Sequence, residues 1–138
     1  MKKIVIYFLI FLSILGFIFV RWATEKKVEL ERNREHEVSL VQTIKNSYRM
    51  IVEIQFKNPR YTEKPGGWDC EVGLTFDDGQ YAEFKIDHAL NMASNFNPVI
   101  VGNSKEEVKE KTDNLKLHNG WTRYKVRVKY SDGTVGEQ

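Results

Sequence analysis

The amino-acid sequence predicts an α+β fold, and three observations support this class. An uncharged apolar run lies near the N-terminus, a charged segment with helical spacing follows it, and several later segments alternate apolar with polar residues. Together they predict an N-terminal transmembrane helix that continues into a stalk helix, which packs on a four-stranded, mostly antiparallel sheet. One helix laid across such a sheet is a cystatin-like arrangement, by analogy.

Residues 4–20 form the apolar run, IVIYFLIFLSILGFIFV. As a helix this run spans about 25 Å, and Trp22 and Ala23 extend it toward the thickness of a hydrocarbon core. Arg21 can reach the lipid headgroups, and a tryptophan is common at a membrane interface. We therefore predict a transmembrane signal anchor over residues 1–23, with residues 4–20 in contact with the membrane.

A cleaved signal peptide, a lipoprotein and a pilin are the alternatives to an uncleaved anchor. A signal peptide would have a basic start, as Lys2 and Lys3 provide, but its apolar stretch is shorter and ends in small residues. No cysteine follows at once for lipid modification, and Gly16-Phe17 lies too late in the run for a pilin. The short N-terminal tail favours a single-pass cell-membrane protein whose soluble domain is extracytoplasmic, although Lys and Arg are nearly balanced across the run.

Residues 24–37 read as a polar helical stalk, because charges alternate along them and few apolar residues interrupt. An apolar stripe at helical spacing follows, made of Val38, Leu40, Val41, Ile44 and Tyr48. We expect this stripe to dock on a compact α+β domain over residues 38–138. A coiled-coil seam is the alternative, for which barely two heptads are available.

Four segments show the alternation of half-buried strands: residues 50–56, 68–76, 81–86 and 121–130. Turns are expected over residues 65–67 and, as a hairpin, over residues 77–80, where glycines allow positive φ. Between residues 88 and 120 we expect a short helix over 88–95, a brief strand over 99–101 and a polar helix. Ser104 and Glu107 form a capping box that begins this last helix.

Composition argues against several functional classes. The 138 residues contain 21 Lys and Arg against 19 Asp and Glu, a net charge of +2, so the chain lacks the basic excess of a nucleic-acid binder. One cysteine, Cys70, excludes an intramolecular disulfide and a cysteine-rich zinc site. We therefore predict no nucleic-acid partner.

The reactive side chains form no recognisable catalytic pattern. Cys70 is in phase with the apolar residues of its strand, so we expect it to be buried and inert. His36, His88 and His118 share no ligand spacing, and Asp77-Asp78-Gly79 lacks the spaced acidic ligands of a calcium loop. No catalytic or metal-binding motif occurs. We predict no catalytic residues, no cofactor and no metal site.

The last predicted strand carries the candidate partner-binding site. Four basic residues project from one of its faces and an aromatic residue precedes them; the set is Trp121, Arg123, Lys125, Arg127 and Lys129. Two interpretations stay open. The charges form cross-strand ion pairs with acidic residues, each worth about 0.2–1 kcal/mol, or they form a docking face for a protein or for anionic envelope material.

The layout, together with the segments KNPRYTEKPGGWDCEVGLTFDDG and TRYKVRVKYSDG, resembles the small anchored proteins of Gram-positive bacteria. Some of these accompany toxin genes of type VII secretion as immunity proteins. The resemblance implies a membrane-anchored, non-catalytic protein-binding module at the cell envelope, an immunity or inhibitor protein against a secreted toxin. The alternative is a structural subunit of a secretion or conjugation assembly, and a third class is an enzyme or small-ligand binder.

Overall fold

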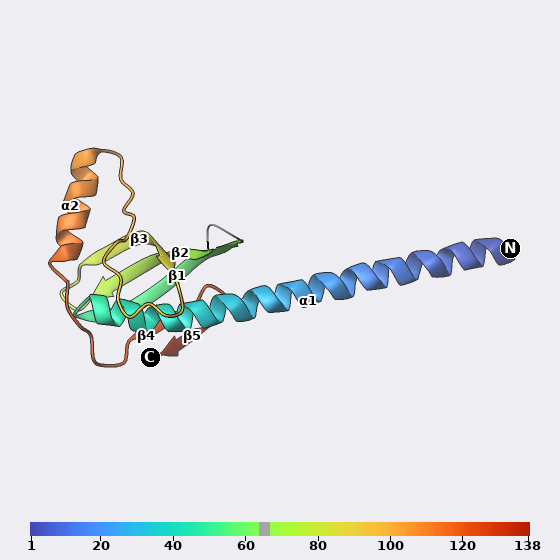
Figure 1. Cartoon of the computed structure of the whole chain (residues 1–138), viewed down its shortest axis with the longest axis horizontal. Coiled ribbons are helices and arrows are strands. Elements are labelled where there is room, and N and C mark those ends of the chain that lie inside the picture. Colours follow the sequence, from blue (N-terminus) through green and yellow to red (C-terminus); the bar gives the residue numbers. More distant parts are fainter. Residues whose placement is uncertain (64–66) are drawn as a thin grey trace. The chain divides into compact units, whose positions relative to one another are not determined.

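The computed structural model describes residues 1–63 and 67–138. They divide into two compact units, Met1–Arg32 and Asn33–Gln138, and Figure 1 shows the elements of each. The turn predicted over residues 65–67 lies outside the described residues, except for Gly67.

Helix α1 runs from Lys2 to Ser47. Its N-terminal part is long and apolar enough to cross a membrane, by length and composition. Every residue from Ile4 to Val20 is exposed. The prediction of one long apolar N-terminal helix is therefore confirmed.

The unit Asn33–Gln138 contains a mixed sheet of five strands in the order β3-β2-β1-β4-β5. The strands are β1 (Ile51–Thr62), β2 (Gly67–Phe76), β3 (Tyr81–His88), β4 (Arg127–Lys129) and β5 (Val135–Glu137). Neighbours are antiparallel except for β1 and β4, which are parallel with Ile54 opposite Val128. The α+β class is confirmed, whereas the predicted count of four strands is wrong.

The last predicted strand, residues 121–130, shortens to β4 because the chain before it binds the end of α1. The N–H groups of Gly120 and Thr122 donate to the carbonyls of Ser47 and Lys45 at 3.0 and 2.8 Å. These carbonyls have no partner within a helix that ends here. The backbone N–H groups that bind these carbonyls cannot also pair with a strand. Pairing therefore begins later: Val126 exchanges hydrogen bonds with Gln138 at 2.7 and 3.1 Å, and the ladder with β1 begins at Arg127.

The core lies between the C-terminal turns of α1 and one face of the sheet. Four of the five residues of the predicted apolar stripe are buried: Leu40, Val41, Ile44 and Tyr48. The prediction is wrong for Val38, which is 39% exposed. The strand prediction over residues 68–76 is confirmed, because Trp68, Cys70, Val72, Leu74 and Phe76 are all buried.

The buried face of α1 also includes five polar residues, two of which lie in the predicted stalk. Asn33 and Glu37, which the sequence placed in the polar stalk, are both buried. Glu37 accepts a hydrogen bond from the N–H of Ser131 at 2.9 Å, and Arg34 pairs with Asp132 at 2.6 Å. These contacts attach the β4–β5 hairpin to the helix. Burial raises the pKa of the Glu37 carboxyl, while the Ser131 hydrogen bond opposes the shift.

Residues between β3 and α2 (Lys105–Lys116) follow an irregular path. Residues 88–95, all of them described, do not form the expected short helix, and the brief strand over 99–101 is reduced to one bridge between Val99 and Lys85. The polar helix is confirmed as α2. Ser104 is its N-cap and accepts from the N–H of Glu107.

Candidate functional site

The structure divides the five predicted partner-binding residues into two groups. Arg127 and Lys129 lie on β4 and both pair with Glu53 of β1, at 3.7 and 3.2 Å. For these two cations the interpretation as cross-strand ion pairs is therefore the better one, because one carboxylate lies between them.

Trp121, Arg123 and Lys125 precede β4 and form what we call the 121–125 segment. Trp121 is 66% exposed, and the guanidinium of Arg123 lies 5.1 Å from the centre of its ring. Within residues 1–63 and 67–138, neither Arg123 nor Lys125 has an ion-pair partner within 4.0 Å. This segment therefore offers an exposed aromatic ring with Arg123 over it, and a second exposed cation, Lys125, two residues later.

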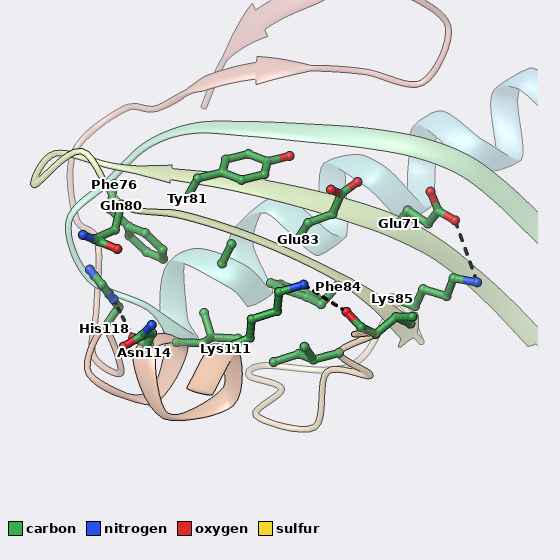
Figure 2. A pocket seen from close by; sticks show the side chains of 14 residues that line it. Glu71, Phe76, Gln80, Tyr81, Glu83, Phe84, Lys85, Lys111, Asn114 and His118 are labelled. Atoms are coloured by element: carbon green, nitrogen blue, oxygen red, sulfur yellow. Dashed lines mark hydrogen bonds and ion pairs between the residues drawn. The ribbon is translucent and has the colours of Figure 1, made fainter. Parts of the chain in front are cut away.

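A pocket of about 450 Å³ opens between β3 and α2, and we call it the β3–α2 groove. Figure 2 shows Tyr81, Glu83 and Lys85 on its strand side and Lys111 and Asn114 on its helix side. The lining includes five consecutive residues of β3, from Tyr81 to Lys85. One wall of the groove is therefore the edge of a strand.

The floor of the groove is apolar and its rim is charged. Phe84 and Leu115 are each 3% exposed and belong to the core, against which Ile100 packs. On the rim, Lys85 pairs with Glu71 at 3.9 Å, and Glu83 has no ion-pair partner within the described part of the chain. The groove can thus accept apolar side chains against its floor and a positively charged side chain beside Glu83 at its rim.

Tyr81 lies across the neighbouring strand because of a glycine. A Cβ atom at Gly73 would stand 2.5 Å from the Tyr81 hydroxyl, so only glycine leaves room for the ring in this position. Burial, followed by the negative charge of Glu83, raises the pKa of the Tyr81 hydroxyl. The hydroxyl therefore stays protonated near neutral pH.

His118 holds α2 against the β2–β3 turn. Its ring stacks on Phe76 with 3.9 Å between ring centroids, Nε2 lies 2.8 Å from Asp78, and Nδ1 lies 3.0 Å from the Asn114 carbonyl. Hydrogen bonds from the Gln80 N–H and from His118 lower the pKa of the Asp78 carboxyl. No sequence pattern around His118 indicated this attachment.

A buried cluster that the sequence did not reveal joins α1 to β2 and β3. The Trp68 indole donates to the side-chain oxygen of Asn33 at 3.0 Å, and His36 stacks on the same indole. His88 contacts the Ser39 hydroxyl through Nε2 at 2.8 Å. Its Nδ1 is buried with no hydrogen-bond partner among the residues described. Trp68 and His88 are partners across β2 and β3, so the cluster lies where β3 ends.

We expect acid to destabilise the fold through His88. Burial, with a smaller contribution from His36, lowers the pKa of His88 from 6.5 to about 4. Between these values the unfolded chain binds a proton that the folded chain does not, so stability falls as pH decreases through this window. At about 1.4 kcal/mol per pKa unit, the loss reaches about 3 kcal/mol at its acidic end.

Urea unfolding of the full-length chain in detergent micelles, repeated across this pH range, measures the effect. His88→Gln is the control, because its side chain can still reach Ser39 but carries no titrating group. The variant should lose most of the pH dependence. If its stability falls in parallel with that of the unsubstituted protein, another group is responsible.

Cys70 behaves as its place in the strand predicts. It is buried, and burial, followed by the charges of Glu37, Asp69 and Glu71, raises the pKa of its thiol. A protonated and inaccessible thiol lacks what a nucleophile needs. In the part of the chain that the structure covers, no group of three or more His, Cys, Asp or Glu residues could hold a metal ion.

No family model, no curated protein and no solved structure matches the chain. The cystatin-like arrangement is therefore not confirmed, and the resemblance to anchored Gram-positive proteins stays a prediction.

Proposed function

We propose that the protein is a non-catalytic protein-binding module that α1 holds in the cell membrane, with its folded domain outside the cytoplasm. The support for the anchor is physical. The apolar side chains from Ile4 to Val20 are exposed, and an apolar helix surface of this length is stable in lipid rather than in water.

The 121–125 segment is the observation that carries the binding proposal. Tryptophan and arginine are the residues most often found at the energetic centres of protein interfaces. Here Arg123 lies over Trp121, so a partner would bind two side chains that are already ordered against each other, which lowers the entropic cost. The positive charges of Arg123 and Lys125 favour an acidic partner surface.

A membrane anchor suits this task because it confines binder and target to one surface and raises their effective concentration. Among such modules we favour an immunity or inhibitor protein against a secreted toxin, in line with the sequence resemblance. The alternative is a structural subunit of a secretion or conjugation assembly, which would use the same surface within a larger complex.

Affinity capture of the tagged full-length protein from detergent-solubilised membranes distinguishes the two. One stoichiometric secreted or envelope polypeptide supports the immunity role, whereas several co-purifying membrane subunits support the assembly role. A pure protein with no partner would count against both and would favour a search for a small ligand or a substrate.

Lys125→Glu tests the docking surface with the captured partner. We expect about tenfold weaker binding, and a smaller difference as salt is added, because charges at an interface rim act through screened fields. Lys125 is a better position for this test than Arg127, because reversing the charge of Arg127 would also break its ion pair with Glu53. Isothermal titration of the full-length chain at two salt concentrations measures both effects.

Lys105→Glu is the matched control, because Lys105 is an exposed lysine at the start of α2. It should leave the affinity unchanged. Equal affinity for the Lys125 and Lys105 variants would remove the 121–125 segment from the proposal.

A further inference from the structure

Strand β3 forms one edge of the sheet, since it stands first in the strand order. In an antiparallel pair, the backbone N–H and C=O groups of one residue point toward the partner strand, and those of the next residue point away from it. Lys85 shows which residues face away from β2: its N–H donates to the Val99 carbonyl at 2.9 Å, and the Val99 N–H donates to its carbonyl at 2.7 Å. Tyr81 and Glu83, four and two residues earlier, therefore face the same way.

The chain leaves this edge directly after Val99. The Val101 carbonyl instead accepts a hydrogen bond from the Lys111 side chain of α2, at 3.3 Å. Among the residues that the structure describes, none gives the outward backbone groups of Tyr81 or Glu83 a backbone partner. Unpaired groups on a strand edge are a template for another strand.

The β3–α2 groove lies along this unpaired stretch. From Tyr81 to Phe84, the part of the edge before the Val99 bridge at Lys85, the strand is about 10 Å long at about 3.3 Å per residue, and the whole of it lines the groove. Leu115 is the buried residue of α2, so most of the helix surface stays off the sheet. Figure 2 shows the side chains of the two walls on either side of the space.

From this arrangement we infer that the β3–α2 groove binds an extended segment of a partner polypeptide, which adds to β3 as an antiparallel strand. The added strand continues the pairing that Val99 begins at Lys85. Its residue opposite Glu83 exchanges two backbone hydrogen bonds with Glu83. This site lies at the opposite edge of the sheet order from β4 and β5, and it is independent of the 121–125 segment.

The groove also specifies the side chains of the bound segment. Residues directly opposite in a sheet point to the same face, so the residue opposite Glu83 lies beside its carboxylate and is best a lysine or arginine. The residues on either side of it point to the opposite face, toward Phe84 and Leu115, and are best apolar. The bound segment therefore has an apolar–basic–apolar pattern in extended conformation.

A peptide with the sequence Val-Lys-Val-Thr, blocked at both ends, is the probe, because it ends before the place opposite Lys85 that Val99 occupies. It is titrated to millimolar concentration into the isotope-labelled full-length chain in lipid nanodiscs, and the amide signals of β3 are followed by nuclear magnetic resonance. We expect the signals of Tyr81 and Glu83 to shift and their hydrogen exchange to slow. No response at these amides would overturn the proposal.

Two N-methylated forms of the peptide test the hydrogen bonds themselves. A methyl group on the lysine nitrogen removes the N–H that faces Glu83, whereas a methyl group on the next valine nitrogen alters an N–H that faces away. The first should weaken binding about three- to tenfold, the usual worth of one hydrogen bond, and the second should change it little. Equal binding of both forms would exclude strand addition.

Two substitutions test the protein side. Glu83→Pro removes the outward N–H but no bond to β2, and proline is tolerated on an edge strand. Glu83→Ala keeps the N–H and removes only the carboxylate. We expect the proline variant to bind at least about threefold more weakly than the alanine variant, and Lys125→Glu to bind the peptide normally.

The amide signals of buried residues show whether each variant is folded. If the proline variant is not folded, the N-methylated peptides test strand addition without it. If the Tyr81 and Glu83 signals shift with protein concentration when no peptide is present, a second copy occupies the edge. That result would overturn the assignment to a partner peptide.

Discussion

The double substitution Ile10→Arg with Ile14→Arg is expected to release the full-length protein from the membrane. Both residues lie near the middle of the apolar part of α1 and are exposed. Arginine at the centre of a membrane helix costs about 2.5–3.5 kcal/mol on insertion scales. Two such residues on one short span therefore bring about 6 kcal/mol against insertion. Alkaline carbonate extraction, followed by immunoblotting of pellet and supernatant, measures the change.

Val28→Arg with Leu30→Arg is the matched control. It introduces the same two side chains at exposed apolar residues of α1 that lie beyond the predicted span. This variant should stay in the membrane pellet. If the Ile10 and Ile14 variant stays there as well, another part of the chain holds the protein at the membrane and the anchor proposal fails.

Leu40→Ala is expected to lower the free energy of unfolding by about 2–5 kcal/mol, the cost of leaving a cavity in a packed core. Leu40 is fully buried where α1 meets the sheet. Urea unfolding of the full-length chain in detergent micelles measures the change. The fluorescence of Trp68 reports on unfolding, because the Trp68 indole is hydrogen-bonded to Asn33 of α1.

Val38→Ala is the control for this change, since Val38 belongs to the same predicted stripe but is 39% exposed. Its substitution should change stability by less than about 0.5 kcal/mol. Similar losses at both positions would mean that α1 is rotated relative to the sheet and that the stripe faces the core as the sequence predicted.

The elements that were predicted correctly depend on local patterns. The apolar run of α1, the alternation along β2 and the cap at Ser104 involve residues close together in sequence. The buried face of α1 was predicted only in part. It includes Asn33 and Glu37, and polar residues are excluded from any stripe that is found by hydrophobicity alone.

The candidate surfaces could be predicted only in part. The basic residues of 121–129 were found, but alternation suggested one continuous strand. The chain instead satisfies the last carbonyls of α1 at Gly120 and Thr122, which leaves Arg123 and Lys125 away from the ladder. No sequence pattern predicted the β3–α2 groove, because its walls come from β3, Ile100 and α2, which are separate segments of the chain.

The sequence by itself thus determined the apolar N-terminal helix, the α+β class and the strands β2 and β3, because side-chain spacing within one segment decides them. The tertiary structure alone decided that β4 runs parallel to β1, that Arg127 and Lys129 pair with Glu53, and that Tyr81 and Glu83 on the edge of β3 have no strand partner within residues 1–63 and 67–138. Each of these depends on which distant segments meet, and that is settled by competition for backbone hydrogen bonds and for space in the core.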